Sequence, residues 1–210
     1  MASFPGFFTA YLILSRHSRV MDVFAAARAH NQKAAAQKWY SLCDPTLAFS
    51  NSSYGSFLDI WRAKAASRAM PKRSEMTPRD LKDFLKDIGI FERIKANPSS
   101  YLIRLVGTGL TKVAGHVTGK TFEDSVPADL LPRYLACCDL VLEGGKPLRF
   151  LGRVLLSGHE YLDAEHLYVP MAGDDGLPAY VMGLFRYTPR HCEKEESWES
   201  QIASIPLGLR

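Results

Sequence analysis

The chain has 210 residues, of which 47% are hydrophobic and 23% charged, a composition typical of a globular protein with a sizeable core. Its net charge of +4 is too small to indicate nucleic-acid binding, and no run approaches the roughly 20 apolar residues of a membrane helix. The four cysteines show neither a metal-finger spacing nor a disulfide framework, so they favour a reducing, cytoplasmic location.

The N-terminal part of the chain contains a short apolar segment, followed by two predicted helices. Residues 4–14 are apolar, but basic residues follow rather than precede them, which is the reverse of a secretory signal peptide. Met21 is an alternative start of translation. Residues 20–39 are rich in alanine, which favours a helix, and a loop containing Pro45 follows. The second helix has an apolar face formed by Phe57, Leu58, Trp61 and Ala65.

The apolar faces of these two helices suggest an assembly. Small side chains let two helices approach closely, so we expect one of the two to mediate a homodimer. Deletion of residues 1–52 is then predicted to give a monomer whose core remains folded.

A third helix is predicted after the connector at residues 70–78. Thr77 is a suitable N-cap, Pro78 suits the first helical position and Asp80 the first turn. Four apolar residues then recur with helical spacing: Leu81, Phe84, Leu85 and Ile88.

Beyond residue 88 the pattern changes to that of an antiparallel sheet. A short helix is predicted over 110–114 and a longer one from Leu130 to Leu142, and hairpin turns join consecutive strands. This order favours an α+β fold with helices on one side of the sheet. The five predicted strands cover residues 90–94, 101–106, 148–156, 161–171 and 180–187.

Residues 114–121 read AGHVTGKT, one residue away from a nucleotide-binding P-loop. A P-loop lies between a buried strand and a helix, whereas here a helix-like stretch precedes the glycines and Pro127 stops any helix after them. We therefore expect no phosphate site. Gly115 and Gly119 are predicted to let the backbone turn tightly between short elements.

Several motifs in order resemble the PAS superfamily, and more closely a bacterial PAS-like family. The resemblance covers roughly residues 55–188. The motifs are Trp61 with its neighbours, Met70-Pro71-Lys72-Arg73-Ser74 with Thr77-Pro78 and Asp80-Leu81-Lys82, Tyr101 to Thr108 (which includes Arg104-Leu105-Val106-Gly107-Thr108), Gly115 with Thr118-Gly119-Lys120, and Leu167 to Met171.

The resemblance implies a five-stranded antiparallel sheet with flanking short helices, and the alanine-rich composition predicts additional N-terminal helices before it. It divides the chain into an N-terminal helical extension (1–52), a PAS-like sensor domain (53–190) and a charged C-terminal tail (191–210). Such domains act as sensors or docking modules and often dimerise through helices outside the core. Because no output domain fits in the remaining residues, we expect a stand-alone module of bacterial signalling that binds a protein partner.

PAS domains often hold a small ligand between the sheet and a helix that here is Leu130–Leu142. The charged candidate is Arg104, which either forms a structural ion pair with Asp83 or Glu92 or recognises a carboxylate or phosphate of the ligand. Cys138 is either a small buried hydrophobe or a ligand-lining thiol. The predicted ligand-binding residues are Arg104, Tyr134, Cys138, Phe150 and Tyr168.

Cofactor chemistry finds little support in the sequence. Haem-binding PAS domains commonly supply a histidine from the helix that here is Leu130–Leu142, which has none, and the Asn-Cys-Arg motif of light-sensing domains is absent. The histidines lack the spacing of a metal site. We therefore expect a colourless, non-enzymatic sensor or adaptor. The alternative is a small enzyme that uses the same cavity, although no Ser-His-Asp set can be assembled.

Overall fold

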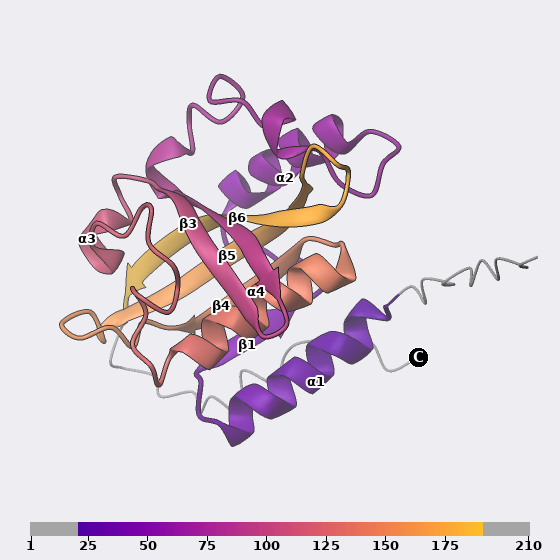
Figure 1. Ribbon diagram of the computed structural model, residues 1–210. Coiled ribbons are helices and arrows are strands. Elements are labelled where there is room, and N and C mark those ends of the chain that lie inside the picture. The colour runs from indigo at the N-terminus through magenta and orange to yellow at the C-terminus, as the bar shows by residue number, and fades with distance from the viewer. Residues whose placement is uncertain (1–20, 191–210) are drawn as a thin grey trace, which may run out of the picture.

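The computed structural model describes residues 21–190, so the apolar segment at 4–14 and the tail at 191–210 lie outside the described residues. Its centre is a six-stranded antiparallel sheet with helices on both faces (Figure 1). In spatial order the strands are β1 (Ser41–Asp44), β4 (Leu148–Arg153), β5 (Leu162–Ala172), β6 (Pro178–Pro189), β2 (Ile88–Ala96) and β3 (Ser99–Val106).

All five predicted strands are present, and the α+β class is confirmed. The sixth strand, β1, was predicted as loop. It has only four residues and stops before Pro45, so no alternation can develop that would mark a strand. It pairs with β4, Ser41 opposite Gly152 and Asp44 opposite Arg149, and the N-terminal extension thereby joins the sheet.

Helices cover both faces of the sheet, and the prediction of helices on one side is wrong. Along β5, Leu167, Val169 and Met171 point to one face and Tyr168 to the other, because neighbouring side chains of a strand alternate. Both sets are buried, so each face needs a cover.

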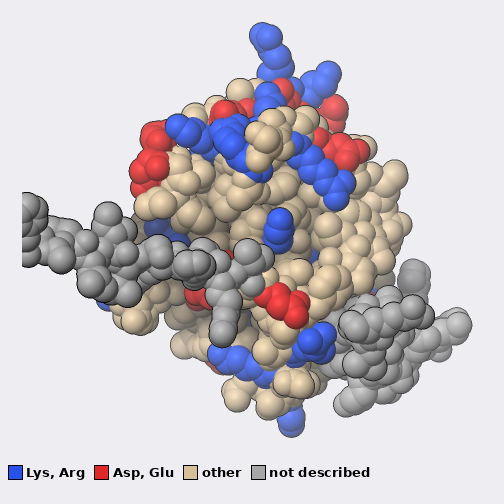
Figure 2. Space-filling model, turned by 90° about the vertical axis from the view of Figure 1, so that its right-hand side faces the viewer, with Lys and Arg blue, Asp and Glu red and all other residues tan. Residues whose placement is uncertain are grey.

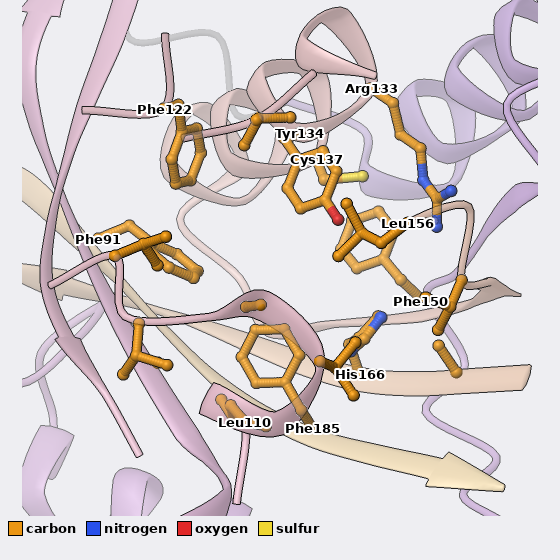
Figure 3. A pocket seen from close by; sticks show the side chains of 18 of the residues that line it. Phe91, Leu110, Phe122, Arg133, Tyr134, Cys137, Phe150, Leu156, His166 and Phe185 are labelled. Carbon is orange, nitrogen blue, oxygen red and sulfur yellow. The ribbon is translucent and has the colours of Figure 1, made fainter. Parts of the chain in front are cut away.

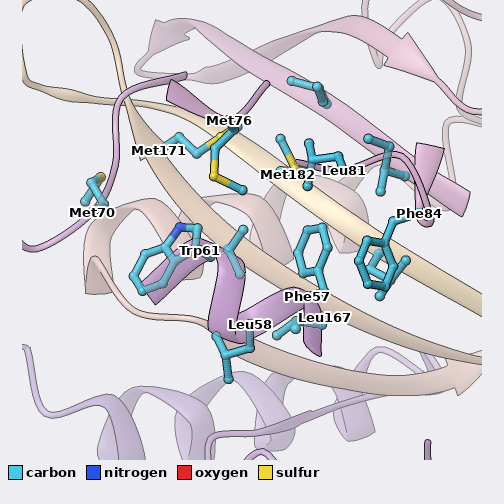
Figure 4. Close-up of a cluster of buried hydrophobic side chains, with 14 of the residues drawn as sticks. Phe57, Leu58, Trp61, Met70, Met76, Leu81, Phe84, Leu167, Met171 and Met182 are labelled. Atoms are coloured by element: carbon cyan, nitrogen blue, oxygen red, sulfur yellow. The ribbon is translucent and has the colours of Figure 1, made fainter. Parts of the chain in front are cut away.

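The first face is covered by α2 (Ser52–Ala65) and the turns that follow it (Figure 4). The Trp61 indole N–H donates to the carbonyl of Pro170 over 2.8 Å, which fixes the helix over β5. Met76 and Met171 fill the space beside the tryptophan ring. The apolar face of α2 is thus used within the chain.

The helix predicted from Thr77 to Ile88 is replaced by turns that end in a short 3₁₀ helix, η2 (Leu85–Asp87). The Lys86 carbonyl accepts from the N–H of Gly109 over 2.7 Å, and β2 begins at Ile88. Within the turns, the N–H groups of Phe84 and Asp87 donate to the carbonyls three residues earlier, each over 2.8 Å, so tertiary packing overrides the α-helical pattern here. A second short 3₁₀ helix, η1, covers Arg73–Glu75.

The P-loop-like segment contains no nucleotide-binding turn. After α3 (Thr111–Ala114), Gly115 and Gly119 take positive φ angles of 74° and 86°, as the turning role requires. The segment then runs along the outer side of β3, where the N–H of Ile103 donates to the carbonyl of Lys120 over 2.9 Å. The N–H of Phe122 donates to the carbonyl of Tyr101 over 2.9 Å.

The second face is covered by α4 (Leu131–Gly144), with α1 (Val23–Ala36) packed beside it and against β1. Asp22 caps α1 by accepting from the N–H groups of Phe24 and Ala25. The buried side of α1 consists of Ala27, His30, Asn31 and Ala34. Of the helices in residues 21–190, none is long and apolar enough to cross a membrane.

Candidate ligand-binding site

A cavity of about 110 Å³ lies between α4 and the sheet, with α3 and the segment after it as further walls (Figure 3). Its walls are mostly apolar because both the helix and this sheet face contribute aromatic and branched side chains. Those side chains include Phe91, Ile103, Leu110, Val113, Phe122 and Phe185.

Three of the predicted ligand-binding residues line this cavity. Tyr134 points into it from α4, while Phe150 and Tyr168 face it from β4 and β5. The ring centroids of Phe150 and Tyr168 are 5.3 Å apart, and the Tyr134 ring packs edge-on against Phe122 with centroids 6.0 Å apart. The structure therefore brings these three residues together.

Cys138 and Arg104 lie elsewhere. Cys138 is a buried core residue, and its neighbour Cys137 faces the cavity instead, because Cys137 is three residues after Tyr134 on the same side of the helix. The side chain of Arg104 is 52% exposed and forms an ion pair with Glu92. Of the two roles predicted for Arg104, the structure therefore favours the structural ion pair over recognition of a ligand.

The polar part of the cavity centres on a residue that sequence reasoning missed. Arg133 lines the cavity, is only 8% exposed and donates one hydrogen bond, from Nη1 to the carbonyl of Arg153 over 3.1 Å. Within residues 21–190 it has no carboxylate partner. The sequence did contain a signal, since an arginine in the first turn of an apolar helix is unfavourable at the positive end of the helix dipole.

His166 is a second missed residue. It lies on β5, lines the cavity and packs edge-on against Phe185 with ring centroids 4.6 Å apart. Its Nδ1 atom is buried without a hydrogen-bond partner in the described part of the chain. Burial, helped by the charge of Arg133, lowers the pKa of His166 to about 3, so the imidazole is neutral at physiological pH.

A thiol and two phenol groups of the cavity are also held neutral. Burial raises the pKa of Cys137 to about 11, and it also raises the pKa of Tyr134 and of Tyr168. A thiol with a raised pKa is a poor nucleophile, and a histidine with a pKa near 3 is a poor general base at neutral pH. At neutral pH, neither Cys137 nor His166 is therefore activated for catalysis.

A family model described as PAS domain matches residues 49–186, about two-thirds of the chain. The chain belongs to the PAS domain family. The match includes the sheet apart from β1 and the last residues of β6, and it includes the cavity between α4 and the sheet. PAS domains are generally sensory, non-catalytic modules of signalling. No curated protein and no solved structure matches the chain.

Proposed function

We propose that this PAS domain is a sensory module that binds a small, partly apolar ligand between α4 and the sheet and reports its presence to a signalling partner. One observation carries the proposal. The cavity combines apolar walls with polar groups, on Arg133 and His166, whose hydrogen-bonding capacity the described residues do not use up. A few polar groups within an apolar cavity are the usual composition of a small-molecule site.

The proposal includes no chromophore. Haem and flavin are at least as large as drug-sized ligands, which occupy sites of about 300–1,000 Å³, whereas this cavity measures about 110 Å³. The purified protein is therefore expected to be colourless. A haem Soret band or a flavin spectrum that survives gel filtration would contradict this expectation.

A protein partner fits the surface better than a nucleic acid does. Figure 2 shows basic side chains beside acidic ones at the top and bottom of the visible face, with a largely uncharged area between them. Nucleic-acid binding instead favours a continuous basic surface. Homodimerisation through the N-terminal helices is also part of the proposal, although the apolar faces of α1 and α2 already pack within the chain. Sedimentation of the full chain at micromolar concentrations tests it.

Ligand binding is tested with a variant that fills the cavity. Ala164 lines the cavity and is 5% exposed, so A164L places extra carbon atoms where the ligand would lie. The matched control is A63L, on the exposed side of α2. Native mass spectrometry and ligand-observed NMR with a library of small apolar compounds should show binding to the wild type and to A63L, and none to a folded A164L. Equal binding to all three, or to none, would contradict the proposal.

A further inference from the structure

We infer that the ligand is a small monocarboxylic acid, whose carboxylate binds the guanidinium of Arg133 and whose apolar tail occupies the cavity. This inference rests on the proposed function and deepens it by naming the class of ligand. It starts from the unpaired charge of Arg133.

Two arginines of the described chain are buried to the same extent, and their surroundings differ. Arg149, 8% exposed, contacts two carboxylates, Asp44 over 3.0 Å and Glu165 over 2.7 Å. Arg133, also 8% exposed, has only the Arg153 carbonyl as a hydrogen-bond acceptor. A guanidinium has five N–H donors and stays charged, so its burial is costly without an anion. The missing partner of Arg133 is therefore an anion from outside the described residues.

The chain makes room for the guanidinium at this place. A Cβ atom on Gly152 would lie 2.9 Å from Nη2 of Arg133 and 2.6 Å from the carbonyl oxygen of Tyr40. Gly152 in β4 therefore lets the side chain of Arg133 lie against the strand. Arg133 also belongs to the first turn of α4, where the helix dipole adds to the positive potential that an anion meets.

A second polar group points to the same end of the cavity. Figure 3 shows Arg133, Tyr134 and His166 directed toward a common space, with the ring of His166 on the sheet side. Within residues 21–190 the buried Nδ1 atom of His166 has no hydrogen-bond partner, so in the tautomer that carries its proton on Nδ1 it is available to donate to a carboxylate oxygen of the ligand. A carboxylate held by Arg133 thus has a further donor within the site.

The dimensions and the charge define the ligand further. An engineered apolar cavity of about 150 Å³ holds benzene, so about 110 Å³ suits a tail of about four to six carbon atoms. A dicarboxylate or a phosphate dianion would bring a second negative charge. The other cavity arginine, Arg153, lies with its guanidinium 5.1 Å from the centre of the Tyr40 ring, and the remaining walls are mostly apolar. One carboxylate is therefore favoured.

The experiment compares acids with neutral amides of the same shape. Pentanoate, benzoate, pentanamide and benzamide are titrated into the full-length wild type by calorimetry at pH 7.5 in phosphate-free buffer. We expect each acid to bind at least about tenfold more tightly than its amide, since hydrogen bonds to charged groups are the stronger ones. In R133M this preference should disappear. The matched control R104M removes an exposed arginine outside the cavity and should retain it.

Three outcomes would overturn the inference. If the amides bind as well as the acids, the ligand is not selected by charge, while the proposed cavity binding stands. If R133M keeps the preference for acids, another group holds the carboxylate. If neither acids nor amides bind and other apolar compounds of the library do, the ligand class is wrong and the sensory proposal remains. The comparison of acid with amide in the wild type requires no variant, so it remains decisive even if R133M does not fold.

Discussion

At the scale of single residues, Arg149 shows how a buried charge is satisfied in this protein. It connects Asp44 of β1 with Glu165 of β5 through the intervening strand β4. The Tyr54 hydroxyl adds a hydrogen bond to the backbone carbonyl of Glu165 over 2.7 Å, so α2 is tied to the same place. The cluster thus links the N-terminal extension, the sheet and the helix of the first face.

Replacement of Arg149 by methionine is expected to be strongly destabilising. The R149M variant leaves the carboxylates of Asp44 and Glu165 buried without their cation, which typically costs about 3–5 kcal/mol. The measurement is urea unfolding followed by circular dichroism. R104M is the control, because its pair with Glu92 is exposed to solvent, where an ion pair contributes little to stability. Equal losses in the two variants would show that burial does not govern these ion pairs.

Two buried histidines predict a dependence of stability on pH. Burial, with smaller contributions from Lys33 and Arg133, lowers the pKa of His30 to about 4, and the pKa of His166 is about 3. In the unfolded chain both have pKa values near 6.5. The unfolded state therefore binds more protons below pH 6.5. The stabilisation is complete above that pH and is lost as the pH falls to about 4 for His30 and to about 3 for His166.

The free energy of unfolding should fall by about 1.4 kcal/mol per pH unit for each of these histidines well below pH 6.5. Urea titrations at pH 7.5, 6.0 and 5.0 measure this slope. The carboxylates remain largely ionised in this range. An H30Q variant should lose about half of the slope, and a stability that is flat from pH 7.5 to 5.0 would show that the histidines are protonated in the native state.

The candidate site illustrates what a pattern of residues can and cannot predict. Tyr134 and Phe150 were predicted because large apolar residues on the relevant helix and strand must face the core. Cys138 was one position off, since a helix turns by about 100° per residue and two adjacent cysteines cannot be distinguished without the orientation of the helix. Arg133 was missed because its missing partner is a property of three-dimensional packing.

At the scale of elements, one side chain of α1 forms two hydrogen bonds with β1. The amide of Asn31 donates to the carbonyl of Cys43 over 2.9 Å and accepts from the N–H of the same residue over 2.7 Å. Asn31 therefore satisfies both outward-facing backbone groups of Cys43 from within the chain.

Replacement of Asn31 by alanine should loosen this edge of the sheet. An unsatisfied buried N–H or C=O group costs about 1–3 kcal/mol, so N31A is expected to lower the free energy of unfolding by at least about 2 kcal/mol. Amide hydrogen exchange should accelerate first in β1. Gln32, exposed on the same helix, gives the control variant Q32A. If N31A exchanges as slowly as Q32A, the paired bonds do not hold the strand.

Helices and strands were predictable from the sequence where the residues that determine them are close together in the chain. The strands β2, β3, β4, β5 and β6 and the helix α4 follow from periodicity and turn residues, which are local. The segment after Thr77 is not a helix, and contacts that are distant in the sequence fix its end, since Gly107 and Gly109 donate to the carbonyls of Ile88 and Lys86. Strand β1 exists only because β4 and Asn31 flank it.

At the scale of the whole molecule, the N-terminal extension is expected to be part of the stable fold. The sequence predicted that a chain without residues 1–52 would keep a folded core. The structure gives reason to expect otherwise, because that deletion removes β1, α1 and the Asp44 partner of Arg149. Thermal unfolding of this truncated chain should occur at least about 5 °C below that of the full chain. Unchanged melting would show that the PAS core is independent of its extension.

The two outer strands of the sheet have a consequence for how other proteins can recognise this one. An exposed strand edge offers a row of free N–H and C=O groups, to which a foreign peptide can add as a further strand and from which fibrils can grow. Here the Asn31 side chain forms hydrogen bonds with the backbone N–H and C=O groups of Cys43 on β1. Residues 119–122 form hydrogen bonds with backbone groups of Tyr101 and Ile103 on β3. Along these parts of both edges the places for an incoming strand are already filled by the chain itself. If the proposed signalling partner exists, it is therefore expected to recognise the shape and charge of side chains on the helices and loops that cover the sheet, rather than to add a strand at these places.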